Sequence, residues 1–312
     1  MDGFLLGELI DFVERNPAEV LGFGGDFERD AAVGFEEEEI SAALHWLDRL
    51  SASERDSPRW RYWRGRTLES LGRTEEARQA YRTIADQRDY HGFLAADRLG
   101  APYAIPSAPL AVPATELDAL LAGSPGLLRA RELYILGREP EAEAEWRQTT
   151  QQFDPPALKR AASLAHRWDW HPQAIATVAR AEYWDDLDLR FPLAYREEVM
   201  NNARASALDP AWVYAVIRQE SGFRPAARSP VGALGLMQIM PATGQEMARQ
   251  LRDAAGGAPD LLLQPETNLR LGVRYLQSIL ERLQGNPVLA TAAYNAGPNK
   301  IAGWLPSRSA VP

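Results

Sequence analysis

Cysteine is absent from the 312-residue chain, and histidine occurs only four times. The lack of cysteine excludes disulfide scaffolds, thiol nucleophiles and cysteine-ligated zinc sites. The histidines are too scattered along the chain to form a local metal motif (His45, His91, His166 and His171). No run of about 18 or more apolar residues occurs, so the sequence has no pattern typical of a membrane-spanning helix.

Basic residues are too few for a nucleic-acid-binding protein. The formal net charge is −9, whereas nucleic-acid recognition needs a basic face. The charge is uneven, because residues 1–191 hold 22 Lys and Arg against 34 Asp and Glu, and residues 192–312 hold 12 against 9. The hydrophobic content of 46% is ordinary for a globular protein, and the length suggests about two domains. The mildly cationic C-terminal third would suit an anionic polymer.

A secretion signal is not recognisable at the start of the chain. Residues 1–3 lack a basic side chain, and the apolar segment Phe4–Ile10 is interrupted by Glu8. We therefore expect either a cytoplasmic protein or a fragment without its natural beginning.

Runs of β-branched residues are nearly absent, and helix-forming residues with three- and four-residue apolar spacing dominate. The segment Leu71–Ala77, followed by Tyr81, is similar to Leu136–Ala142, followed by Trp146. In each, a glycine ends one helix and acidic residues begin the next. Gly65, twelve residues before Ala77, adds a spacing similar to tetratricopeptide-type hairpins, which stack into superhelices. The alternative is two unrelated helix turns of similar composition.

Two breaks divide the helical patterns into three parts. The Pro-rich stretch Gly100–Pro113 cannot continue a helix and predicts a connector, and a second break falls near Asp186–Pro192. We predict an α-superhelical domain over 1–112, a helical linker domain over 113–190 and a third domain over 191–312. Glycine and proline are concentrated in the third part, where three unusual segments occur.

The first segment contains a helix with clear end signals. Asp209 is a good N-cap, Pro210 suits the first helical position, and Gly222 suits the residue after the end. These signals predict a helix from Pro210 to Ser221.

Glu220 stands where the apolar stripe of this helix predicts a core residue. The stripe is Val213, Val216 and Ile217. Burial and the negative end of the helix both disfavour the charged carboxylate, so the pKa of Glu220 should rise. A neutral Glu near neutral pH can protonate a leaving oxygen. The alternative is a glutamate at the rim that reaches water or pairs with Arg218 or Arg224.

The second segment, Ser229–Pro241, is a glycine-containing loop followed by a helix start. Gln238 is a hydrogen-bonding amide among apolar neighbours and suits an amide or hydroxyl of a ligand. Met237 and Met240 have flexible apolar side chains that could line the walls of a ligand site. The alternative is that both methionines belong to the hydrophobic core, where methionines at this spacing are also found.

The third segment, Ala290–Pro298, ends a helix that starts near Pro287. Tyr294 lies in the last turn, where its hydroxyl can reach across a cleft. A lone tyrosine before a helix end is commonly structural, so its interpretation depends on the three segments together.

Together these segments closely resemble the soluble lytic murein transglycosylases in order and spacing. The resemblance covers residues 191–305, and the upstream helices look like the superhelical and linker regions that precede this domain. The matching segments are Gln219–Ser221, Gly235–Pro241 and Ala293–Gly297, together with Phe191–Tyr195 and Leu262–Asn268.

The resemblance implies a mainly α fold, with an α-superhelical N-terminal part of helical hairpins and a goose-lysozyme-like, mostly helical catalytic domain. It implies cleavage of the β-1,4 bond between N-acetylmuramic acid and N-acetylglucosamine in peptidoglycan, which leaves a 1,6-anhydromuramyl end. Glu220 matches the single catalytic acid/base, and Tyr294 matches the tyrosine that hydrogen-bonds at the reacting centre. The positions that match residues lining the saccharide subsites are Ser229, Met237, Gln238, Met240 and Asn295.

A single carboxylate is sufficient for this chemistry. Ordinary glycosidases use two, but Glu246 and Glu266 stand in solvent-facing helix contexts. The 2-acetamido oxygen of the sugar can assist departure of the leaving group, and the C6 hydroxyl can then attack C1 intramolecularly. No metal or other cofactor is needed.

The implied partners are peptidoglycan glycan strands in the periplasm, with no nucleic acid and no transmembrane segment. The helical arc should dock against cell-wall-complex proteins or orient the glycan. Domains of this family usually continue past Gly303–Leu305 into another helix, so we expect truncation at both ends. About 190 upstream residues should form an open arc rather than a ring.

Other classes of function make different demands on the sequence. A muramidase on the same fold requires a second carboxylate near Glu220 that positions water. A non-catalytic peptidoglycan-binding scaffold requires a disabled site, which the intact Glu220 and Tyr294 argue against. A helical-repeat adaptor with a globular cap leaves the three segments unexplained.

Overall fold

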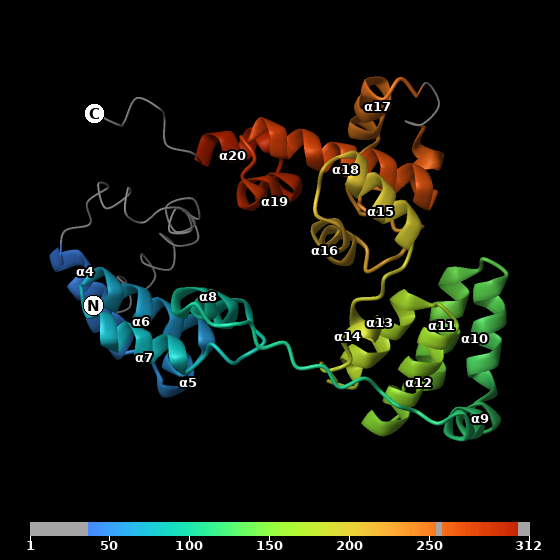
Figure 1. The fold of residues 1–312 in the computed structure, drawn as a ribbon. Coiled ribbons are helices and arrows are strands. Elements are labelled where there is room, and N and C mark those ends of the chain that lie inside the picture. Colours follow the sequence, from blue (N-terminus) through green and yellow to red (C-terminus); the bar gives the residue numbers. More distant parts are fainter. Residues whose placement is uncertain (1–36, 254–257, 305–312) are drawn as a thin grey trace. The chain divides into compact units, whose positions relative to one another are not determined.

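The computed structural model describes residues 37–253 and 258–304. The segment inspected for a secretion signal and the last eight residues, 305–312, therefore lie outside the described residues. Within them the chain is mainly helical and has no strand, only two isolated β-bridges, so the predicted fold class is confirmed. No helix in the described part is both long and apolar enough to cross a membrane. The chain divides into two compact units, residues 107–302 and the remainder (Figure 1).

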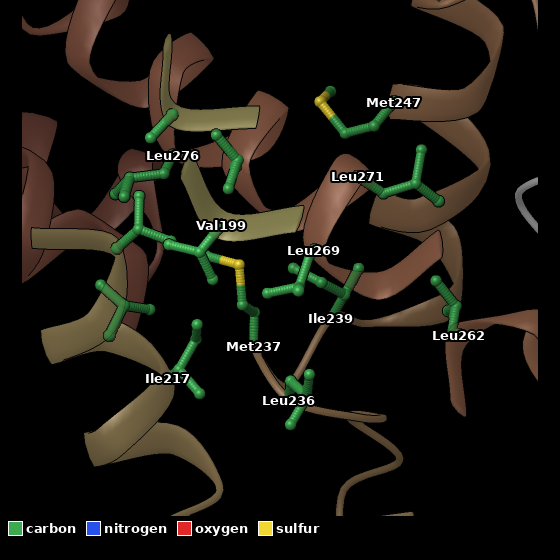
Figure 2. Close-up of a cluster of buried hydrophobic side chains, with 14 of the residues drawn as sticks. Val199, Ile217, Leu236, Met237, Ile239, Met247, Leu262, Leu269, Leu271 and Leu276 are labelled. Atoms are coloured by element: carbon green, nitrogen blue, oxygen red, sulfur yellow. The ribbon is translucent and has the colours of Figure 1, made fainter. Parts of the chain in front are cut away.

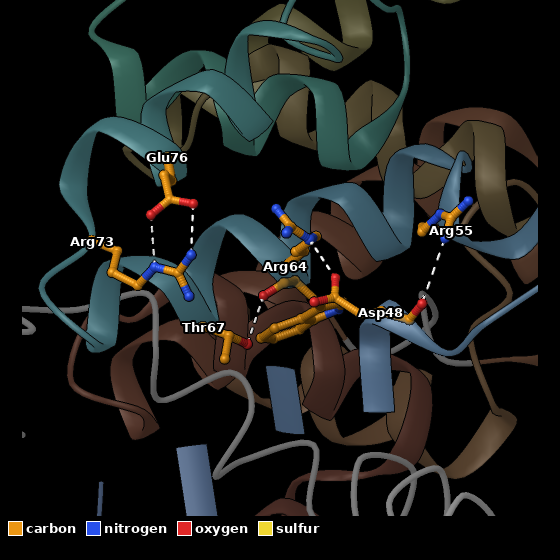
Figure 3. A network of polar contacts seen from close by, with 7 residues as sticks. Asp48, Arg55, Arg64, Thr67, Arg73 and Glu76 are labelled. Carbon is orange, nitrogen blue, oxygen red and sulfur yellow. Dashed lines mark hydrogen bonds and ion pairs between the residues drawn. The ribbon is translucent and has the colours of Figure 1, made fainter. Parts of the chain in front are cut away.

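The first unit is built from helical hairpins around a small core. Tyr62, Leu68 and Tyr81 are buried in this core. Ion pairs lie on the surface of this unit (Figure 3). The Arg73 guanidinium donates two hydrogen bonds to the Glu76 carboxylate, and Arg64 Nε donates to Asp48 Oδ1 at 2.9 Å. The helices are α4 (Glu37–Asp48), α5 (Ala52–Arg55), α6 (Pro58–Ser70), α7 (Thr74–Arg82) and α8 (Tyr90–Leu99).

The hairpin turn that the sequence predicts twice is confirmed in each unit. Gly72 and Gly137 adopt positive φ values of 71° and 70°. In each turn the next backbone N–H donates to the carbonyl five residues earlier at 2.9 Å. This is the left-handed helix ending that glycine favours, and it reverses the chain into the next helix.

The aromatic residue after each turn packs inward as predicted. Tyr81 and Trp146 are both buried. Gly65 is required for close packing, because a Cβ there would lie 2.4 Å from the Tyr81 ring. The equivalent position in the second hairpin is Ala130, which is also small and fully buried.

The second unit begins with a helical layer around stacked aromatic rings. Trp170 lies between Tyr134, which stacks on it at 4.6 Å, and Trp146, which meets it edge-on at 5.4 Å. Residues 101–113 contain no helix, as predicted for the connector. Within the second unit, Asp186 accepts a hydrogen bond from the Leu110 N–H at 2.8 Å. The helices are α9 (Ala114–Gly123), α10 (Pro125–Ile135), α11 (Glu139–Thr150), α12 (Pro155–Arg167), α13 (His171–Arg180) and α14 (Leu187–Arg190).

The rest of this unit forms a separate apolar cluster around the long helix α18, which contacts α15, α17, α19 and η2 (Figures 1 and 2). Ile217, Leu236 and Leu276 lie in this cluster. The elements are α15 (Arg196–Ala205), α16 (Pro210–Glu220), α17 (Pro241–Gln250), the 3-10 helix η2 (Pro259–Leu263), α18 (Pro265–Arg282), α19 (Pro287–Ala296) and α20 (Pro298–Trp304).

Candidate active site

Glu220 is the last residue of α16, and the predicted helix signals are confirmed. The side chain of Asp209 caps the N-terminus by accepting a hydrogen bond from the Ala211 N–H at 2.8 Å. The apolar stripe is buried as far as Ile217, and Glu220, one turn later, is half-buried where the stripe reaches the surface. Burial raises the pKa of the Glu220 carboxyl, in the predicted direction.

The arginines nearest in sequence bind other groups. Arg218 donates to the Arg190 carbonyl at 3.0 Å, and Arg224 pairs with Glu143 at 3.1 Å. Neither forms a salt bridge with Glu220 in the described part of the chain. Among the described residues, burial is the influence that shifts the pKa of the Glu220 carboxyl, and it favours the neutral form.

A tight reversal follows Glu220 and holds the end of α16. Gly222 and Phe223 both have positive φ, 56° and 70°. The Ser221 hydroxyl accepts a hydrogen bond from the Phe223 N–H at 3.1 Å and donates to the Ile217 carbonyl at 3.2 Å. The Phe223 side chain is buried in the core. These contacts fix the backbone from which the carboxyl projects.

The loop between α16 and α17 carries most of the predicted saccharide contacts. The Ser229 hydroxyl accepts a hydrogen bond from the Ala233 N–H at 2.9 Å, so it also closes a turn. Gln238 has a φ of 48° and donates its side-chain amide to the carbonyls of Gly235 and Ala227, at 2.9 and 3.3 Å. Both amide protons are therefore donated within the loop, and the side-chain oxygen is the atom that could accept a hydrogen bond from a ligand, so the role of Gln238 in ligand binding stays a prediction.

The two methionines of this loop have different environments. Met240 is 42% exposed, as an apolar wall requires. Met237 is fully buried, and a Cβ on Gly272 would lie 2.5 Å from its sulfur (Figure 2). The prediction that the Met237 side chain lines a saccharide subsite does not fit this structure, because that side chain lies fully buried in the apolar core.

Tyr294 comes from α19 and contacts the loop through Met237. Its hydroxyl donates to the Met237 carbonyl at 2.7 Å, and its ring lies 5.4 Å from that of Tyr275. Burial, followed by the charges of Glu220 and Tyr275, raises the pKa of Tyr294 well above its usual value. The phenol stays protonated and is an electrostatic neighbour of Glu220. Asn295, the next residue, is exposed.

Asn268 is a polar residue of this region to which the sequence patterns assigned no role. It is fully buried on α18 and bonds to three backbone groups of the loop and η2. The sequence did contain a signal for a special role of Asn268, because it is an amide on an otherwise apolar face of the helix. Leu271 and Gly272 on the same face are buried.

The two other carboxylates considered from the sequence lie outside this arrangement. Glu246 is exposed and forms an ion pair with Arg249, and Glu266 is exposed in the first turn of α18. A cavity of about 290 Å³ lies elsewhere, between His166 and His171 and the segment Phe191–Ala194. In the described residues, no group of three or more His, Cys, Asp or Glu side chains could hold a metal ion.

Two family models match this chain. The transglycosylase SLT domain matches residues 198–311, and the soluble lytic murein transglycosylase L domain matches residues 120–187. Residues 120–187 and 198–311 therefore match two domains of the soluble lytic murein transglycosylases. The resemblance stated from the sequence motifs is confirmed.

Relatives and solved structures agree with this assignment. The soluble lytic murein transglycosylase of Salmonella typhimurium is 36% identical over 265 residues, which is 83% of this chain and 40% of that protein. An inactive mutant of the lytic transglycosylase Slt from Pseudomonas aeruginosa matches with a TM-score of 0.80 and 37% identity, over 86% of this chain and 44% of that one. A 70-kDa soluble lytic transglycosylase in complex with bulgecin A matches with a TM-score of 0.77 and 32% identity, over 86% and 43%. The chain spans about 40% of the length of the curated relatives it matches.

Proposed function

We propose that this protein is a lytic transglycosylase that cleaves the β-1,4 bond between N-acetylmuramic acid and N-acetylglucosamine in peptidoglycan and forms 1,6-anhydromuramyl ends. The observation that carries the proposal is the Glu220 carboxyl, which is half-buried at the end of α16 and has a raised pKa because of that burial. The matches to a transglycosylase domain and to soluble lytic murein transglycosylases support the substrate class.

Glu220 begins the reaction as a neutral acid. Its proton passes to the glycosidic oxygen while the bond from C1 to that oxygen breaks, and the 2-acetamido carbonyl oxygen of the same sugar attacks C1. The ionised Glu220 then takes the proton of the C6 hydroxyl as O6 attacks C1 and displaces the acetamido oxygen. The carboxyl is restored to its neutral form, so one residue supplies both steps.

The sugar competes with water through proximity. An attacking group on the same ring reaches an effective molarity of about 10⁵ M or more, so it can exceed the rate of hydrolysis. We assign Tyr294 to the reacting centre and Ser229, Gln238, Met240 and Asn295 to the glycan subsites. The positions of Ser229 and Gln238 on the loop between α16 and α17 support the assignment of these two residues. The exposure of the Met240 side chain supports the assignment of Met240.

The domain division and the location of the protein follow from the same proposal. We propose three domains with boundaries at 112/113 and 190/191, and three apolar clusters, within residues 44–99, 110–189 and 175–294, support their number. The clusters do not coincide with the boundaries, because Leu110 packs with the second cluster and Ile175 with the third. Peptidoglycan as the substrate places the protein in the periplasm, with the helices before residue 113 available to orient the glycan or to dock partner proteins.

Digestion of purified sacculi by the wild-type protein tests the proposed reaction. We expect muropeptides that end in 1,6-anhydromuramic acid, each lighter by one water molecule than the hydrolysed equivalent, and mass spectrometry separates the two. Hydrolysed products would instead identify a muramidase. Binding to sacculi without any released muropeptide would identify a scaffold.

A further inference from the structure

Arg224, in the segment that follows α16, forms an ion pair with the helical layer α9–α14. Its Nε donates a hydrogen bond to Oε1 of Glu143 on α11 at 3.1 Å, and both side chains are partly buried. The two residues are 81 positions apart in the chain. Glu143 lies in the part that matches the L domain, and Arg224 lies in the part that matches the transglycosylase SLT domain. The ion pair therefore joins these two parts within the second unit.

The same arginine lies against the reversal that follows Glu220. A Cβ on Gly222 would lie 3.8 Å from Arg224 Nη1, so the guanidinium is in van der Waals contact with the reversal. The Arg224 backbone N–H donates to the Ser221 carbonyl at 3.3 Å. Ser221 and Gly222 are the two residues directly after Glu220. Arg224 thus connects Glu143 to the backbone next to the candidate acid.

The two ends of this segment, residues 221–227, are held by other contacts. At the first end, the Ser221 hydroxyl donates to the Ile217 carbonyl of α16 at 3.2 Å. At the second end, the Ala227 carbonyl accepts from the Gly235 N–H at 2.8 Å. The ion pair holds the middle of the segment, and its partner residue comes from the helical layer.

The last turn of α16 has a further contact with the helical layer. Arg218 Nε donates to the Arg190 carbonyl, at the end of α14, at 3.0 Å. The guanidinium carbon of Arg218 lies 5.8 Å from the centre of the Phe191 ring. Glu220 therefore lies between two arginines, Arg218 and Arg224, that both contact residues of the helical layer.

Glu139 is the other carboxylate of α11 near Arg224. Glu139, Glu143 and Arg224 line one small cavity. In the described residues, however, the carboxylate that forms an ion pair with Arg224 is that of Glu143. The direct contact thus singles out Glu143 among the acidic residues of this helix.

We propose that Glu143 is a positioning residue for Glu220, because its ion pair with Arg224 holds the reversal after α16 against the helical layer. The inference rests on the proposed function, in which Glu220 is the acid. A partly exposed ion pair contributes little to stability. A displacement of about 1 Å in a reacting group, by contrast, can lower a rate by about a hundredfold. The pair therefore matters more for turnover than for folding.

The test is a charge-reversal cycle in the full chain, with muropeptide release from sacculi as the assay. Glu143→Arg and Arg224→Glu each place like charges together, and each should lower kcat about tenfold with KM changed by less than about twofold. The double variant Glu143→Arg/Arg224→Glu restores an opposite pair. It should recover kcat to within about threefold of wild type, since residues in contact are non-additive. Losses that multiply in the double variant would overturn the inference.

An ion pair on the same helix provides the matched control. Glu145 of α11 pairs with Arg129 of α10 at 2.6 Å, entirely within the helical layer. Arg129→Glu should leave kcat within about twofold of wild type, and all these variants should keep the melting temperature within about 4 °C. A tenfold loss of kcat in Arg129→Glu would show that turnover follows the integrity of the helical layer, which would contradict a specific role for Glu143.

Amide hydrogen exchange tests the reversal without any substrate. Glu143→Gln keeps the size of the side chain and removes its charge, so it replaces the reversed variants if these do not fold. Exchange of the Phe223 and Arg224 amides, which both donate to Ser221, should accelerate in Glu143→Gln and stay unchanged in Glu145→Gln. Unchanged exchange in Glu143→Gln would contradict the inference. If wild type releases no muropeptide, the proposed function fails, and the exchange result alone then decides whether Glu143 holds the reversal.

Discussion

At the scale of single residues, Glu220 shows how a helix can present an acid. The stripe of α16 that buries Val213 and Ile217 brings the next residue of the same phase, Glu220, to the point where the helix ends and the stripe reaches the surface. The helix spacing predicted this position and the raised pKa. It could not predict the direction of the Tyr294 proton, because that depends on a contact between residues 57 positions apart.

Glu220→Gln is expected to abolish turnover and to leave glycan binding largely intact. The amide keeps the shape of the side chain but has no acidic proton to donate. Muropeptide release and co-sedimentation with sacculi measure the two properties. Glu246→Gln, at an exposed carboxylate, should behave like wild type. Retained activity above about one per cent in Glu220→Gln would contradict its role as the acid, since general acid catalysis contributes about 10²–10⁴-fold.

The same substitution is expected to change stability in a pH-dependent way. A carboxyl whose pKa is raised in the folded state contributes stability below its unfolded pKa and loses that contribution as the pH rises through the folded value. Glu220→Gln should therefore match the wild-type melting temperature at acidic pH and exceed it at neutral and alkaline pH. Thermal unfolding at several pH values measures the difference, and a constant difference would contradict the effect of burial.

At the scale of elements, the sequence predicted most of the helix ends near the site. Asp209 and the prolines at positions 210, 241 and 287 begin helices as expected. The loop before α17 was less predictable, because its shape depends on a non-glycine residue at positive φ, Gln238, and on a distant amide, Asn268. Neither leaves a periodic signal, so the inward direction of Met237 was missed.

Gly235→Ala and Gly232→Ala separate backbone strain from crowding in this loop. Both glycines have positive φ, 76° and 93°, so each substitution costs about 1–2 kcal/mol in strain. A Cβ on Gly235 would also lie 2.2 Å from the Leu262 carbonyl oxygen, whereas nothing lies within 4 Å at Gly232. We expect Gly235→Ala to cost at least about 2 kcal/mol more in denaturant unfolding and to lose activity. Equal costs would contradict the close packing of the loop on η2.

At the scale of the whole molecule, each of the two units has its own apolar core, and only one unit contains the candidate active site. Residues 107–302 contain the site and two of the apolar clusters, and the first unit has its own cluster around Tyr81. The sequence indicated the first unit through its hairpin repeat, since Gly65 and Tyr81 pack as the repeat requires. The arrangement of such hairpins into an arc remains a prediction.

Tyr81→Ala is expected to destabilise the first unit by about 3–5 kcal/mol, because it removes a buried aromatic ring. Separate cores imply that amide hydrogen exchange, followed peptide by peptide, should accelerate in α6 and α7 and remain unchanged in α15–α19. Tyr90→Ala, at a side chain 60% exposed in the same unit, is the matched control and should change neither region by more than about 0.5 kcal/mol. Faster exchange in α16 or α18 of the Tyr81 variant would show that the core of the first unit supports the site.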